Sequence, residues 1–160
     1  MTICRGVLSN RVPLEELPSP LTDIGVLASG GLIFRPTHGF VCLEAPDIPG
    51  LAFSVTTDAG VEIGTASLLF APDIASVART GHIGAELLPD FRGQGRTGQI
   101  VRSLLPVLRE NGVADVLLTC DEGQEASVKI CLGVGATPID DLPPMTPDGA
   151  TKRRFLLSEP

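Results

Sequence analysis

The sequence of 160 residues contains no tryptophan and no tyrosine, and phenylalanine supplies all six of its aromatic side chains. Its four cysteines form no Cys-x-x-Cys pair, and no cysteine or histidine spacing is typical of a zinc site. We therefore expect free thiols, no bound metal and a reducing compartment, the cytoplasm.

Positive charge is also scarce, because 12 Lys and Arg stand against 19 Asp and Glu, which gives a formal net charge of −7. Binding to a phosphate backbone needs a basic surface, so nucleic acid is not an expected partner. No apolar run approaches the ~18 residues of a membrane span. No basic flank followed by a long apolar run opens the chain, so we expect neither a membrane segment nor a signal peptide.

What the chain has is enough apolar material for one compact domain over residues 1–160, since 43% of its residues are hydrophobic. Its first half predicts short strands separated by Gly and Pro. Residues 1–22 look irregular, with at most one helical turn at 14–17. The strands that we expect are 24–27, 32–35, 39–43, 51–56, 61–70 and 80–88, with breaks at Pro36 and at 46–50.

After residue 89 the apolar period changes from two to 3.6. A helix is predicted over 97–110, with a kink at Pro106. A strand buried on both faces is predicted at 113–120 and a second helix at 122–132. Two last strands are expected at 137–139 and 151–157, joined by the Pro-rich segment 140–149. The order of elements indicates a mixed α/β fold with its helices in the second half.

The segment with the strongest chemical signal is Arg-Gly-Gln-Gly-Arg-Thr-Gly, residues 92–98, between a predicted strand and a predicted helix. Amides at a glycine-rich helix start point toward one spot, and the helix dipole favours an anion there. An ordinary strand-to-helix turn remains an alternative for this segment alone. It lacks the glycine and lysine spacing of a nucleoside-triphosphate loop and that of a dinucleotide site.

Residues 81–136 resemble the GNAT superfamily of acyl-CoA-dependent N-acyltransferases. Its signature, Arg/Gln-x-x-Gly-x-Gly/Ala, is matched by Arg92 and Gly95, while Thr97 departs from it and Gly98 follows at once. The flanking segments GHIGAELLP and VLLTCDEGQEASVKICLGVGA resemble the strand before this loop and the strand and helix after it. The order agrees over 62–157, whereas residues 1–60 show neither a match nor the two early helices of the family.

The resemblance implies a mostly antiparallel sheet with splayed fourth and fifth strands, flanking helices and, in this chain, a β-rich N-terminal part. Residues 61–158 would bind acyl-CoA, and 1–60 would form an atypical acceptor side. It also implies transfer of an acyl group, acetyl by default, from acyl-CoA directly to a primary amine of a small molecule or peptide. The residues expected to bind the cosubstrate are Leu87, Leu88, Arg92, Gly93, Gln94, Gly95, Arg96, Thr97, Gly98 and Gln124.

The catalytic candidates are a base and an acid. Along the strand, Glu86 shares a face with His82 and lies beside the expected thioester, so Glu86 is the expected base and His82 the lesser candidate. The family's acid is a Tyr at the position held here by Cys131, which is otherwise a small core residue, and water could protonate the thiolate instead. An inactive acyl-CoA-binding module, a purely structural subunit and a homodimer all remain open.

Overall fold

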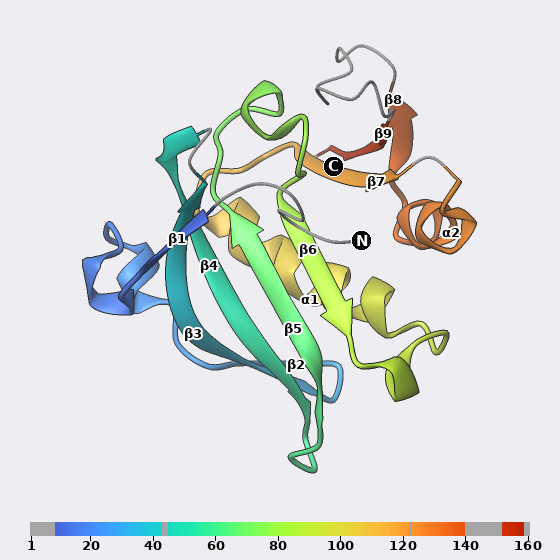
Figure 1. Ribbon diagram of the computed structural model, residues 1–160, viewed down its shortest axis with the longest axis horizontal. Coiled ribbons are helices and arrows are strands. Elements are labelled where there is room, and N and C mark those ends of the chain that lie inside the picture. The colour runs from blue at the N-terminus through green and yellow to red at the C-terminus, as the bar shows by residue number, and fades with distance from the viewer. Residues whose placement is uncertain (1–8, 43–44, 122, 140–151, 159–160) are drawn as a thin grey trace.

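The computed structural model describes residues 9–42, 45–121, 123–139 and 152–158, which form two antiparallel sheets and two α-helices (Figure 1). The larger sheet runs in the order β1-β3-β4-β5-β6, with β2 paired to the start of β3, and the smaller sheet in the order β7-β9-β8. The strands of the larger sheet are β1 (Ser9–Val12), β2 (Leu27–Ser29), β3 (Leu32–Cys42), β4 (Ala45–Thr57), β5 (Glu62–Leu69) and β6 (Ile83–Leu87). The other elements are α1 (Arg96–Glu110), β7 (Val116–Asp121), α2 (Glu125–Gly133), β8 (Thr137–Ile139) and β9 (Lys152–Leu157).

This arrangement confirms the predicted mixed, mostly antiparallel fold with a β-rich first half. Within the described residues no α-helix precedes α1, and short 3-10 turns at Leu14–Glu16, Leu21–Asp23, Ala75–Val77 and Pro89–Phe91 provide the remaining helical segments. The α-helices have 15 and nine residues, and neither is long and apolar enough for a membrane span. The predicted connection 140–149 lies outside the described residues.

The first half departs from prediction at its breaks. Residues 32–35 and 39–43 were expected as two strands, but β3 is continuous and absorbs Pro36 at a bulge between Pro36 and His38. A bulge tolerates a proline because one residue there makes no ladder bond. The predicted loop at 46–50 is wrong as well, since it belongs to β4. There Pro49 lacks an N–H but its carbonyl accepts from the Phe70 N–H at 3.0 Å.

Strands β6 and β7 each begin three residues later than predicted, and two strand positions in the first 30 residues differ as well. Strand β1 lies within the segment predicted to be irregular, and it pairs with the end of β3. The strand predicted at 24–27 begins instead at Leu27. Both are short edge segments, whose position depends on pairing with β3 rather than on their own sequence.

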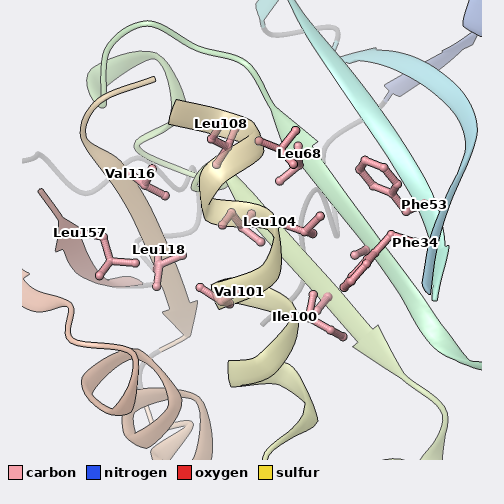
Figure 2. Close-up of a cluster of buried hydrophobic side chains, with 14 of the residues drawn as sticks. Phe34, Phe53, Leu68, Ile100, Val101, Leu104, Leu108, Val116, Leu118 and Leu157 are labelled. Carbon is pink, nitrogen blue, oxygen red and sulfur yellow. The ribbon is translucent and has the colours of Figure 1, made fainter. Parts of the chain in front are cut away.

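Helix α1 joins the two sheets through one core (Figure 2). Its apolar stripe, which has the predicted 3.6 period, buries Ile100, Leu104 and Leu108 completely. Phe34 and Phe53 of the larger sheet and Leu118 and Leu157 of the smaller sheet belong to the same cluster. Each fully buried side chain of this size contributes about 1.5–3 kcal/mol, so α1 holds the sheets in a fixed relation.

Candidate functional site

Strands β6 and β7 meet at one point and then diverge (Figure 1). The His82 N–H donates to the Leu117 carbonyl at 2.8 Å. Just before it, Gly81 has φ +72°, and a Cβ there would lie 2.9 Å from the same carbonyl oxygen, so a larger residue would push the strands apart. Beyond this point β6 pairs with β5, whereas β7 pairs with β9. The predicted splay therefore lies between β6 and β7.

The edge of β6 that faces away from β5 is the side on which the strands diverge. The Leu88 N–H donates to the Ile63 carbonyl of β5 at 2.9 Å. Since alternate residues of an antiparallel strand point their backbone groups to opposite edges, those of Leu87 point away from β5. The Leu87 carbonyl accepts from Arg92 Nε at 3.0 Å, which ties the strand end to the following loop. Of the two predicted residues, Leu87 therefore presents its backbone toward the splay.

The loop after β6 ends at the start of α1. Gly93 and Gly95 have φ of +77° and +74°, a conformation that glycine adopts readily. Gly95 is the N-cap of α1, and within the described part of the chain no side chain caps it. The first bond of the helix runs from Gln99 N–H to the Gly95 carbonyl at 3.2 Å, so the amides at 96–98 precede the intrahelical ladder.

This loop fits an anionic group of a ligand. A Cβ at Gly93 or Gly95 would meet no atom within 4 Å, so open space adjoins the loop. Arg92 and Arg96 add two positive charges at the positive end of the helix dipole. Gln94 is exposed and donates its side-chain amide to the Asp90 carbonyl at 3.3 Å, which closes the loop on itself. The arrangement can bind a phosphate or pyrophosphate.

The predicted residue on the other strand's side is Gln124, the N-cap of α2. Its side chain is exposed, and its amide oxygen accepts a weak bond of 3.5 Å from Ser127 Oγ. Gln124 follows β7 and Leu87 ends β6, so the two residues lie on opposite sides of the gap between the diverging strands.

Glu86 lies on the solvent side of β6. Its side chain is exposed, whereas its neighbours Ala85 and Leu87 are buried in the core. The strand register places Thr65 of β5 beside Glu86, and Ser54 of β4 beside Thr65, in one polar row. The carboxylate therefore lies on the face of β6 opposite to the one that packs in the core.

Cys131 is fully buried in the main core, together with Val128 on the inner face of α2. Its thiol hydrogen-bonds the Cys120 thiol, and burial first and the Cys120 charge second raise the pKa of Cys131 to about 12. Protonating a thiolate of ordinary pKa ~8.5 from such a thiol would cost about 5 kcal/mol. The position of Cys131 favours the core role among the alternatives that the sequence left open.

His82 is fully buried as well. Its Nδ1 accepts from the Leu117 N–H at 2.9 Å, and its Nε2 lies 3.0 Å from the Ala71 carbonyl. Both ring nitrogens thus have partners within the protein, which favours a structural role for His82 over that of a base. A lone histidine on a strand more often has such a structural role than a catalytic one, but its partners Leu117 and Ala71 could not be read from the sequence.

Neither a protein-family model nor a curated protein matches the chain. Solved acetyltransferase structures do match it. An acetyltransferase from Agrobacterium tumefaciens aligns over 85% of this chain and 95% of its own, with 12% identity and a TM-score of 0.59. RimL, a ribosomal alpha-N-protein acetyltransferase in complex with coenzyme A, aligns over 69% of this chain, with 16% identity and a TM-score of 0.54.

The match spans only 62% of the RimL chain. At these identities the likeness concerns the fold alone. The two matches show that the chain has a GNAT-like acetyltransferase fold.

Proposed function

We propose that this protein transfers an acyl group, acetyl by default, from acyl-CoA to a primary amine of a small molecule or peptide. The observation that carries the proposal is the start of α1, with Gly93 and Gly95 and no side-chain cap, directly beyond the edge of β6 that pairs with no other strand of the described residues. A phosphate-binding helix start next to a strand edge suits a ligand that has both a pyrophosphate and an extended arm with amides.

The chain's own groups divide the binding. The amides at 96–98 and the guanidinium groups of Arg92 and Arg96 hold the pyrophosphate. The backbone of Leu87 pairs with the amides of the extended arm, and the exposed side chain of Leu88 lies beside it. Gln124 reaches the arm from the other side of the splay. When bound, acyl-CoA supplies an activated thioester carbonyl, which the edge of β6 orients.

The chemistry needs one base. The acceptor nitrogen attacks the thioester carbon, the C–N bond forms, and the C–S bond breaks. Glu86 takes the proton that the amine loses. Water protonates the departing thiolate, because Cys131 is buried with a pKa near 12 and makes a poor acid. The amine approaches over the face of the sheet that carries Glu86 and Thr65. Glu86 is exposed there, and the described residues that precede α1 form no α-helix that could cover this face.

The test measures CoA binding by calorimetry and thiol release from acetyl-CoA with a panel of amines. Glu86→Gln is expected to lower kcat by about 10²–10⁴-fold without weakening CoA binding. Glu110→Gln, the same change at an exposed residue at the far end of α1, is the matched control and should leave turnover unchanged.

If the wild-type protein does not bind CoA, the proposal is wrong. The burial of Cys131 favours a second candidate, an acyl-CoA-binding module without catalysis. That candidate predicts tight binding of acetyl-CoA, no turnover on any amine, and identical ligand-induced stabilisation of wild type and Glu86→Gln.

A further inference from the structure

Four hydrogen bonds converge on His82, which precedes β6 and contacts Leu117 of β7. We call this point, from which the two strands diverge, the vertex. The His82 N–H donates to the Leu117 carbonyl at 2.8 Å, and its carbonyl accepts from the Leu69 N–H at 2.8 Å. The imidazole adds the bond from the Leu117 N–H to Nδ1 at 2.9 Å and the contact of Nε2 with the Ala71 carbonyl at 3.0 Å. One residue thus links β6 to β5, to the segment after β5 and to β7.

The partners fix the protonation state of the ring. A backbone N–H can only donate, so Nδ1 carries no proton, and the Ala71 carbonyl can only accept, so Nε2 carries it. Burial lowers the pKa of His82, and this outweighs the Ala71 carbonyl and the Asp73 charge, which act in the opposite direction. The neutral ring is therefore the form that joins Leu117 to Ala71.

A small change of angle at the vertex produces a larger displacement at the far end of β6. Leu87 lies five residues after His82, a distance of about 16 Å along an extended strand. A change of about 5° in the angle between β6 and β7 would then displace Leu87 by roughly 1.4 Å relative to β7. Displacements of this size can lower a reaction rate about 10²-fold when reacting groups must be aligned.

We infer that His82 is a positioning residue: its imidazole fixes the angle at which β6 and β7 diverge. It thereby sets the spacing between Leu87 at the end of β6 and Gln124 after β7. The inference rests on the proposed function, because that spacing matters only if acyl-CoA binds between these two strands. The bond that does this is the one to Leu117 on β7, whereas the Ala71 bond stays on the β5 side.

Two substitutions separate these bonds. In His82→Asn the side-chain oxygen stands as many bonds from Cα as Nδ1 does, so it can still accept from Leu117 but cannot reach Ala71. In His82→Gln the terminal amide stands at the distance of Nε2, so it can still donate to Ala71 and leaves the Leu117 N–H without its partner. Both variants lose one buried bond and the ring volume, and both should unfold at a lower temperature than wild type.

The readout is the Kd for CoA, measured by calorimetry at a temperature where both variants are folded, together with hydrogen exchange of the Leu117 amide. His82→Gln is expected to bind CoA at least 10-fold more weakly and to exchange this amide faster. His82→Asn should stay within about threefold of wild type. Equal CoA affinity of the two variants, or a greater loss in His82→Asn, would overturn the inference.

A measurement on the wild type keeps the inference testable if neither variant folds. Saturating CoA should slow exchange of the Leu117 amide, because ligand and vertex fix the same angle. Unchanged exchange at Leu117 would refute the positioning role. Failure of the proposed function would look different, since the wild-type titration itself would then show no CoA binding.

Discussion

Substituting Gly95 by alanine tests the loop at the start of α1 through two separable effects. The first is on stability. Gly95 has φ +74°, and its added Cβ would meet no atom within 4 Å, so the cost is confined to the backbone. Holding a non-glycine residue in the left-handed region costs about 1–2 kcal/mol. For a domain of this size that corresponds to a fall of roughly 2–8 °C in Tm.

The second effect is on the ligand. The methyl group would occupy the open space at the loop, where the proposed pyrophosphate approaches the amides at 96–98. Loss of one hydrogen bond to a charged group costs about 1.5–3 kcal/mol, which weakens CoA binding by roughly 10- to 150-fold. Gly95→Ala should therefore lower CoA affinity beyond anything that its lower stability explains.

Gly112→Ala is the matched control. Gly112 follows the other end of α1, has φ +90°, and likewise has no atom within 4 Å of an added Cβ. It should lose the same 1–2 kcal/mol of stability and bind CoA as wild type does. Thermal unfolding with and without CoA, and calorimetric titration, give both quantities. If Gly95→Ala and Gly112→Ala bind CoA equally, the assignment of this loop to the pyrophosphate is refuted.

Three predictions concern the fold. Leu104→Ala, which truncates a fully buried side chain of the main core, should cost about 2–5 kcal/mol in a denaturant titration, whereas Leu132→Ala, at a side chain 51% exposed, should change stability by less than ~0.5 kcal/mol. Gly64→Ala would place a Cβ 2.2 Å from a backbone oxygen of β6, so it should cost about 1–3 kcal/mol or more; an unchanged denaturation midpoint would contradict this packing. Burial lowers the pKa of both His82 and His38 below 6.5 in the folded chain. The unfolded chain then takes up protons first, so the unfolding free energy should fall as the pH drops below about 6.5. His82→Asn should show a smaller fall, and an equal one would refute the contribution of His82.

The second half of the chain was predictable because its signals are local. The apolar stripe of α1 repeats every 3.6 residues, and the helix begins and ends within one residue of the prediction, continuing through Pro106. Strand β5 was also predicted to within a residue at each end. In both segments the residues that face the core follow the period of the element itself.

The first half was less predictable because pairing overrides its local breaks. Pro36 would end an isolated strand, but β4 pairs with both sides of the bulge and holds β3 together. Pro49 cannot donate to a ladder, yet its carbonyl is used by Phe70. These partners lie 14 or more residues away in the sequence, so no local pattern identifies them.

In the candidate site, too, features that depend on local sequence were more predictable than features that depend on tertiary packing. The exposure of Glu86 follows from alternation along one strand, whereas His82, which the same alternation placed on the face of Glu86, is buried. Cys131 was placed by its position in a motif, but helix packing decides what a side chain at that position touches, and here it touches Cys120 in the core. The residue at the position of the family's tyrosine is therefore a buried thiol of raised pKa, which is a poor proton donor. In the proposed reaction the proton for the thiolate has to come from solvent, and water reaches the site over the exposed face around Glu86, where the described residues place no α-helix before α1.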